Sequence, residues 1–426
     1  MLVQITEPLA SHEVPCWRAG YRCHWRSGRV RERVGYYASI ESLFFLTEAL
    51  TVLHWSRASD RFGRKAILLI GLSGTALSML CFGLSRTFWR LVVSRCLMGV
   101  LNGNFGVIES AIADMRDPSN RAQGFAYVLV AWDAGAALGP LVGGLLARPH
   151  DNFPRLFRGK FWNELPYFLP CLVTSGFVFL TFFVVFALFT EVHSPTHTRM
   201  RSGRRLSREP LPVRNLLSFP VLISLANYVT LSFLHIALSA LLPLFLAMPI
   251  AHGGLGLPPA TIGQILSLNS VPTALFQVFF SARLIQHFGA ARVFVAGLAA
   301  CVPSFTLLPL MSCVAQHKGL TSVVWALLGV VLALGALLGT SFGAIFMFVA
   351  PAAPTSSRGT VNGLTQTAVS SAKALAPALA TSLFSLSVER NLLGGYAVYG
   401  VFLVLSGLAL LLAKHLPAEV WDEVDD

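Results

Sequence analysis

Five ionisable or amide side chains within the apolar stretches of this 426-residue chain stand out by their spacing and depth. Glu41 and Glu48 lie seven residues apart in one such stretch, and Arg95 and Asn102 repeat that spacing in another. Seven residues make about two helical turns, so each pair shares one face of a helix. An ionisable group inside hydrocarbon is costly and marks a functional site by default.

Asp133 is a fifth residue of this kind. It lies about 17 Å into its apolar stretch at the helical rise, close to the centre of a bilayer about 30 Å thick. Glu41 and Arg95 lie at similar depths in their own stretches, so these two are expected to pair. The five residues are candidates for binding a proton or lining a cavity. The alternative for each is a polar contact inside a helix bundle with no coupling role.

Two further strings combine glycine with charge or proline. DRFGRK, residues 60–65, places four charged residues, together with Phe62 and Gly63, between two long apolar stretches. GAALGPLVGG, residues 135–144, repeats Gly135, Gly139 and Gly143 every four residues, with Gly144 following. Glycines at that spacing let a second backbone approach one helix face, and Pro140 removes one backbone hydrogen bond and allows a bend.

The elements that must carry these residues are transmembrane helices. Hydrophobic residues make up 54% of the chain and charged residues 12%, against about 25% charged in a soluble domain. Eleven apolar stretches are each long enough to cross a bilayer. They cover about 34–56, 66–84, 90–113, 122–147, 165–190, 218–246, 260–281, 292–313, 321–350, 362–388 and 393–413. An all-α polytopic membrane protein is predicted.

Composition and motifs exclude several other classes. The net charge of +12 lies mostly in short loops beside apolar stretches, where it indicates topology rather than nucleic-acid binding. The seven cysteines imply no disulfide framework, and those near the N-terminus match no zinc-ligand spacing, so no metal is expected. The strings GxxxxGK[ST], GxSxG and HExxH are absent, so we expect no enzyme and no cofactor.

The chain is predicted to fold as two related halves. Arg121 and Pro140 in the first half correspond to Arg358 and Pro377 in the second, both pairs at an offset of 237, and DRFGRK is echoed by QHFGAAR at 286–292. Such internal similarity is expected of transporter repeats. The predicted parts are a polar N-terminus (1–33), a bundle of five helices (34–190), a cytoplasmic linker (191–217), a bundle of six (218–414) and an acidic tail (415–426).

DRFGRK, RCLMGVLNGN and GAALGPLVGG together resemble motifs of the major facilitator superfamily, the last one those of its drug:proton antiporter branch. Longer strings, such as VGYYASIESLFFLTEALTVL and NGLTQTA, look like fungal multidrug and plant zinc-induced-facilitator-like transporters. The resemblance implies that Asp60 lies against the start of helix eleven near Val361. Ser56 stands where the family has glycine, and Arg61, Arg64 and Lys65 would form charge pairs that latch the two bundles. The resemblance also implies a proton-coupling role for Arg95.

The resemblance further implies proton-coupled antiport of a small organic solute or drug by alternating access. The expected partners are that solute, protons and the lipid bilayer, with no nucleic acid, and the chain is expected to act as a monomer. The plasma and vacuolar membranes both remain open. The alternatives are a transport-inactive remnant or sensor of the same fold, and a proton symporter for a nutrient.

The start of the chain motivates the first alternative. The family resemblance begins at what corresponds to helix two, so eleven helices are expected instead of twelve. Without residues 1–33, the loops on the DRFGRK side of the membrane carry more Lys and Arg than the loops on the opposite side. With eleven helices, the arginines before Val34 fall on that opposite side, and the difference in Lys and Arg between the two sides then nearly vanishes. These are Arg18, Arg22, Arg26, Arg29, Arg31 and Arg33. We therefore expect the first helix of the family to be missing.

Overall fold

The computed structural model describes four main ranges and some single positions. They are residues 30–113, 149–189 apart from 154 and 158, 218–349 and 358–417, together with isolated helical positions between 124 and 146. Within these ranges the regular structure is helical and contains no strand. Residues 1–29 of the polar N-terminus, the linker at 191–217 and most of the acidic tail lie outside them, whereas residues 30–33 belong to the first described helix.

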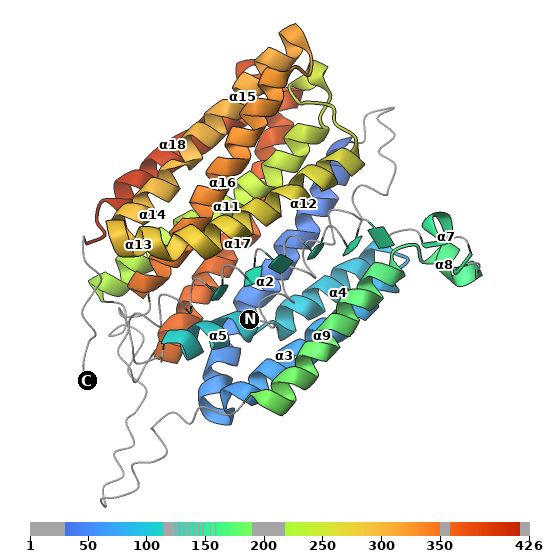
Figure 1. The fold of residues 1–426 in the computed structure, drawn as a ribbon, viewed down its shortest axis with the longest axis vertical. Helices are drawn as coiled ribbons and strands as arrows, with labels where there is room; N and C mark the ends of the chain where they lie inside the picture. Colours follow the sequence, from blue (N-terminus) through green and yellow to red (C-terminus); the bar gives the residue numbers. More distant parts are fainter. Residues whose placement is uncertain are drawn as a thin grey trace, which may run out of the picture.

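The helices form two groups, which Figure 1 shows on either side of α2 and α17. The N-terminal half contains α2 (Val30–Phe62), α3 (Arg64–Gly83), α4 (Phe88–Leu101), α5 (Asn104–Ala113), α7 (Pro149–Asn152), α8 (Lys160–Glu164) and α9 (Phe168–Leu188). The C-terminal half contains α11 (Phe219–Ala247), α12 (Pro259–Phe276), a π-helical turn (Gln277–Ser281), α13 (Ala282–Phe288), α14 (Ala290–Ala299), α15 (Cys301–Lys318), α16 (Ser322–Val349), α17 (Arg358–Glu389) and α18 (Ala397–Ala413). Short 3-10 turns lie at Ile250–His252 and Leu392–Gly395.

Eight of the described helical spans are long and apolar enough to cross a membrane. α18 is apolar but shorter, and α2, which carries two acids in its apolar stretch, is not in that set. The boundaries agree with the predicted stretches in most places; α16, for example, covers 322–349 against the predicted 321–350. The all-α polytopic prediction is confirmed.

DRFGRK, which separates two apolar stretches in the sequence, contains almost no loop in the structure. Residues 60–62 continue α2, and α3 begins at Arg64, so only Gly63 separates the two helices. Gly63 has φ 92° and ψ 154°, a conformation that a residue with a Cβ rarely adopts. The backbone N–H of Gly63 still donates to Ser59 O at 3.0 Å, which completes the last turn of α2.

The predicted span at 90–113 is observed as one apolar span, Phe88–Ile108, but it contains an interruption. Its helix is interrupted after Leu101, where Asn102 has φ −84° and ψ 86°, and α5 restarts at Asn104. Gly103 at the interruption packs directly on Trp55 of α2, so closely that an added Cβ would clash with the indole. The corresponding helix of the C-terminal half, α16, is continuous over 322–349. The break is therefore a local feature of the N-terminal half.

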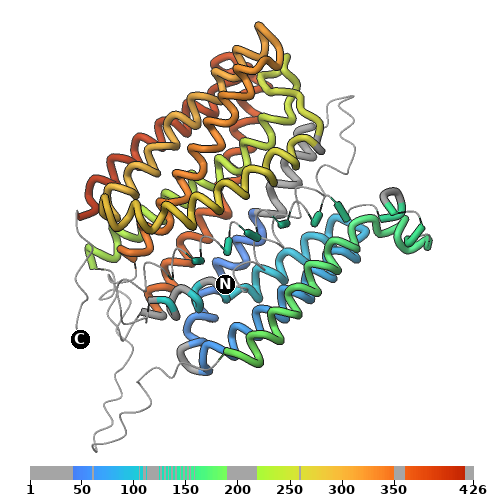
Figure 2. Tube along the Cα trace, in the orientation of Figure 1, coloured from blue at the N-terminus to red at the C-terminus, as the bar shows by residue number. Residues whose placement is uncertain are grey.

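Matching contacts in the two halves confirm the predicted repeat, and Figure 2 separates the halves by colour. Gly289 between α13 and α14 has φ 84° and ψ 150°, almost the conformation of Gly63. The Thr51 hydroxyl donates to Gly99 O at 3.5 Å, and the Gln277 amide donates to Ala336 O at 3.2 Å. Gly99 and Ala336 are separated by the same 237 residues as the proline pair.

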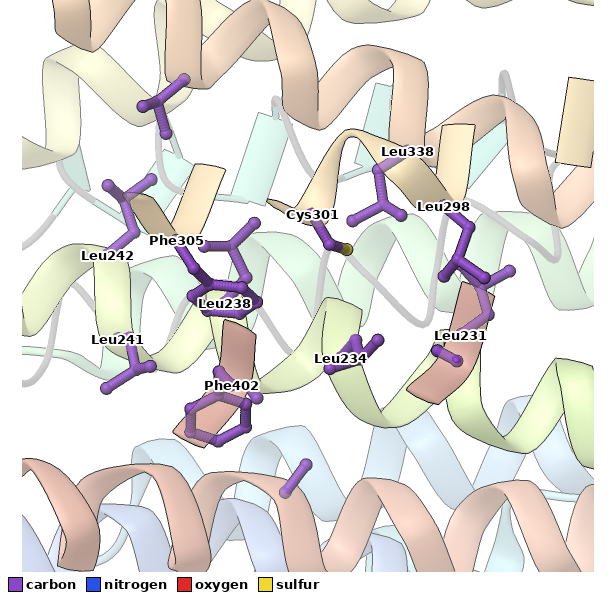
Figure 3. Packing of buried hydrophobic residues seen from close by; sticks show 14 of the residues in the cluster. Leu231, Leu234, Leu238, Leu241, Leu242, Leu298, Cys301, Phe305, Leu338 and Phe402 are labelled. Atoms are coloured by element: carbon purple, nitrogen blue, oxygen red, sulfur yellow. The ribbon is translucent and has the colours of Figure 1, made fainter. Parts of the chain in front are cut away.

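The largest buried cluster of the described residues lies mainly in the C-terminal half, where α11 packs against α15, α16, α17 and α18. Leucines at 231, 234, 238, 241 and 242 of α11 meet Leu298, Cys301 and Phe305, as Figure 3 shows. The rings of Phe305 and Phe402 stack with centroids 5.3 Å apart. Because lipid tails are as apolar as leucine, close van der Waals packing, rather than exclusion of water, holds such helices together.

Candidate functional site

The two halves meet mainly along α2 and α17, a contact that we call the seam. The two helices are antiparallel: Glu48 contacts Ser370 through a hydrogen bond, and one turn further along, Phe45 lies beside Lys373. A step of three residues back along α2 is thus matched by a step of three forward along α17. Side chains of one helix face therefore meet side chains of the other, turn by turn.

Glu48 is the central polar residue of the seam and is only 6% exposed. Asn102 Nδ2 donates to Glu48 Oε1 at 2.8 Å, and Ser370 Oγ donates to Glu48 Oε2 at 2.9 Å. Asn102 belongs to the same half as Glu48, whereas Ser370 belongs to the other half. The Glu48 carboxylate therefore accepts one hydrogen bond from its own half and one from the other half.

The interruption of α4 explains how Asn102 reaches the carboxylate. Because the helix ends at Leu101, Asn102 leaves helical geometry and becomes the capping residue. Gly99, one turn earlier, lets α4 approach α2 so closely that an added Cβ would collide with the backbone of Phe44. The glycine contact and the helix break thus bring an amide to a carboxylate that is 54 residues earlier in the chain.

A second polar contact lies one turn from Ser370 along α17. The buried Gln366 amide donates to the Tyr228 hydroxyl of α11 at 3.5 Å, within the C-terminal half. The Tyr228 ring also packs edge-on against Phe346 at 5.3 Å. Polar side chains of α17 therefore face both α2 and α11.

Lys373 lies on the next turn of α17 in the other direction. Its ammonium is 5.6 Å from the centre of the Phe45 ring and 5.9 Å from that of Trp132. Both rings belong to the N-terminal half, so this cation points into the seam. A cation over an aromatic face is stabilised electrostatically, and more strongly where water is excluded.

Arg95 is buried within the N-terminal half, at 4% exposure. Its guanidinium lies 4.6 Å from the Phe82 ring centre of α3 and contacts the Met98 sulfur at 3.5 Å. The backbone of Glu41 is helical, but its side chain lies outside the described residues, so the predicted pair of Arg95 and Glu41 stays a prediction.

Ser56 marks the end of the seam nearest DRFGRK. It is 3% exposed and lies between two glycines, Gly106 of α5 and Gly363 of α17. A Cβ on Gly363 would lie 3.0 Å from Ser56 Cβ, which is tighter than ordinary contact. Carrying the register of the seam four residues further brings Asp60 level with the first turn of α17, whose N–H groups favour an anion. The Asp60 side chain itself lies outside the described residues.

The predicted latch residues are only partly described. The Lys65 ammonium lies 5.6 Å from the ring centre of Phe186 on α9, a contact within its own half. The side chain of Arg61 lies outside the described residues, and Arg64 is half-buried at the start of α3. The proposed charge pairs between the halves stay a prediction.

The glycine motif lies in the sparsely described stretch. Gly135, Gly139 and Gly143 are helical and buried, as one packed face requires. Asp133, Pro140 and Gly144 lie outside the described residues.

Several residues of the seam and of the adjoining helix α11 were not found from the sequence. Ser370, Gln366 and Tyr228 looked like ordinary polar or aromatic positions of apolar helices, and so did His235, whose ring packs edge-on against Phe342 at 5.2 Å. A usable signal was present, since Ser370 and Lys373 stand one turn apart and so share a face of their helix.

Comparison with known proteins decides the family. The sequence model of the Major Facilitator Superfamily matches residues 33–252 and 244–423, nearly the whole chain. The chain belongs to the Major Facilitator Superfamily. Membrane transport and an integral, multi-pass location in the membrane follow from that membership together with the eight apolar spans.

Members of the superfamily with named functions are similar over most of their length. Protein ZINC INDUCED FACILITATOR-LIKE 1 of Arabidopsis thaliana is 29% identical over 84% of this chain and 77% of its own. Efflux pump azaK of Aspergillus niger is 28% identical over 91% and 81%. The crystal structure of the human organic anion transporter MFSD10 superposes with a TM-score of 0.70 at 20% identity and covers 97% of both chains, which shows a shared fold.

Proposed function

We propose that this chain is a proton-coupled antiporter that exports a small organic solute, with Glu48 as a proton-binding group. The observation that carries the proposal is the buried Glu48 carboxylate, which joins the two halves through Ser370. Alternating access requires the halves to separate at one end and close at the other. A titratable group placed between the halves links its protonation state to that movement.

The hydrogen bonds of Glu48 supply the sign of the coupling. Both donors, the Asn102 amide and the Ser370 hydroxyl, favour the charged carboxylate. Protonation removes the charge and turns one oxygen into a donor. A hydrogen bond to a charged group is worth about 1.5–3 kcal/mol and a neutral one about 0.5–1.5 kcal/mol. Proton binding therefore weakens the seam, and proton release strengthens it.

The direction of transport is supported by the names of relatives and by the glycine motif. An efflux pump is among the similar proteins. GAALGPLVGG resembles the motif of drug:proton antiporters, and three of its glycines lie buried on a helix. Export of a solute in exchange for protons agrees both with the efflux pump among the similar proteins and with the glycine motif.

The test uses the full chain in sealed vesicles with an imposed pH gradient. Labelled neutral, cationic and anionic aromatic solutes serve as probes. Wild-type protein is expected to concentrate at least one probe on the acidic side, whereas a symporter would concentrate it on the alkaline side. Glu48→Gln is expected to abolish accumulation but to retain exchange of labelled for unlabelled probe at equal pH. Pumping by Glu48→Gln at the wild-type rate would refute the role of this carboxyl group.

Two further variants serve as comparisons for Glu48→Gln in the pumping assay. Glu389→Gln, at an exposed carboxylate near the end of α17, should pump like the wild type. Asp133→Asn tests the second proton candidate: loss of pumping in both Glu48→Gln and Asp133→Asn would indicate two coupled groups, whereas loss in Asp133→Asn alone would move the proton site away from the seam.

The same vesicles test whether transport requires a helix ahead of α2. We infer that α2 to α9 correspond to the second to sixth helices of the family. If no probe moves, but transport appears once an apolar helix is fused ahead of Val30, the inactive alternative is favoured. Transport by the present chain would rule that alternative out.

A further inference from the structure

Two basic residues stand at the same level along α11 and α17 of the C-terminal half. Gln366 of α17 bonds to Tyr228 of α11 at 3.5 Å, which sets the register of these two helices. Seven residues, or two turns, further along each helix stand Lys373 and His235. Both therefore occupy the same helix faces as the bonded pair, about 10 Å deeper in the bundle.

A packing contact supports this register independently. Ile236 of α11 packs against the buried cluster that contains Phe45 and Ala374. Ile236 and Ala374 directly follow His235 and Lys373 in sequence. The two basic residues thus belong to one region, where α11, α17 and α2 approach one another.

Aromatic rings surround the two basic groups. The Lys373 ammonium lies 5.6 Å from the Phe45 ring centre and 5.9 Å from that of Trp132, both in the N-terminal half. The His235 ring meets Phe342 of α16 edge-on at 5.2 Å. The rings come from three separate segments, and two of those segments belong to the half opposite Lys373.

Lys373 and His235 are half-buried rather than buried. The lipid-facing side of α17 is marked by Leu375, which is 59% exposed and lies about 200° around the helix from Lys373. The Lys373 ammonium lies instead beside the Phe45 and Trp132 rings of the opposite half. A solute that enters between the halves would meet the ammonium there.

We propose that Lys373 and His235, flanked by the rings of Phe45, Trp132 and Phe342, bind the anionic group of an aromatic organic acid. An ammonium has only donors, and an imidazole can supply another, so together they match the acceptor oxygens of a carboxylate. The rings offer faces and edges to the aromatic part of the same solute. This site rests on the proposed transport function and specifies the charge of its substrate.

The first test needs no variant. Equilibrium binding to the full chain in lipid nanodiscs at pH 7, without any gradient, is measured for naphthalene-1-carboxylate, naphthalene-1-carboxamide and 1-naphthylmethylammonium. The three probes share one ring system and differ in charge. The carboxylate is expected to bind about 10-fold or more tightly than the amide, and the ammonium most weakly. Equal binding of all three, or preference for the ammonium, would overturn the proposal.

Variants then assign the preference to its residues. Lys373→Gln is expected to reduce the preference for carboxylate over amide about 10-fold or more, and Lys373→Arg to keep most of it. His235→Gln, which retains a donor, should reduce the preference less. Lys318→Gln, at an exposed lysine outside the seam, should bind like the wild type. An unchanged preference in Lys373→Gln would contradict the assignment.

The outcome separates this proposal from the proposed function. Charge-selective binding without pH-driven accumulation would support the anion site and refute proton-coupled antiport. Accumulation of neutral or cationic probes, with no preference for the carboxylate in binding, would support antiport and refute the anion site.

Discussion

The hydrogen bond from Ser370 to Glu48 makes a quantitative prediction about the balance between conformations. Ser370→Ala removes the described polar contact of 2.9 Å that joins α17 to the Glu48 carboxylate, while Asn102 continues to donate to the other oxygen. A hydrogen bond to a charged group contributes about 1.5–3 kcal/mol. If the bond exists only while the seam is closed, its loss shifts the equilibrium toward the open seam about 10- to 150-fold.

Spin labels can measure this shift. Phe62, 75% exposed at the end of α2, and His287, exposed near the end of α13, precede the equivalent glycines of the two halves. Cysteines introduced at both sites, with the native cysteines replaced, report the distance between the halves at that end. Ser370→Ala is expected to add or enlarge a population at longer distance. Acidification of the wild type should act in the same direction, because protonation of Glu48 removes the same charged acceptor.

Ser371→Ala is the matched control. Ser371 is the next residue of α17, but its hydroxyl donates to Thr367 O within the same helix at 2.7 Å. This variant should leave the distance distribution unchanged. The reasoning fails if Ser370→Ala retains the wild-type distribution at neutral pH, or if Ser371→Ala changes it equally.

Three further predictions concern a close helix contact, a backbone conformation and a buried cation. Gly99→Ala should lower the melting temperature in detergent, because its Cβ would collide with the backbone of α2, whereas Gly329→Ala, with nothing within 4 Å, should not; equal melting temperatures would show that α4 can move away at no cost. Gly63→Ala should cost about 1–3 kcal/mol of stability, because φ 92° with ψ 154° is a conformation essentially restricted to glycine; unfolding in denaturant measures the cost, and a neutral result would contradict that backbone strain. Arg95→Met should change stability by no more than about 2 kcal/mol, since it exchanges a cation over Phe82 for an apolar side chain, yet lower pH-driven transport; undiminished transport would leave Arg95 a purely structural residue.

The positions of most helices could be predicted from the sequence because lipid imposes a simple rule. Every spanning helix needs about twenty apolar residues, and that requirement can be read locally, as in 322–349 and 219–247. The internal repeat could also be predicted locally, because the strings around Gly63 and Gly289 resemble each other and mark equivalent turns of the two halves. The helix break at Asn102 was missed because a lone asparagine beside a glycine is compatible with either a continuous or an interrupted helix.

The partners of the charged residues could not be predicted. From the sequence, Glu48 was a candidate because of its chemistry and its place in an apolar helix. Only the tertiary structure decided that its carboxylate meets Asn102, 54 residues away, and Ser370, 322 residues away. The same holds for Lys373, which meets rings of the other half. Sequence distance carries no information about such contacts, because they arise from how whole helices pack, and that packing also decides which buried charges lie between the moving halves.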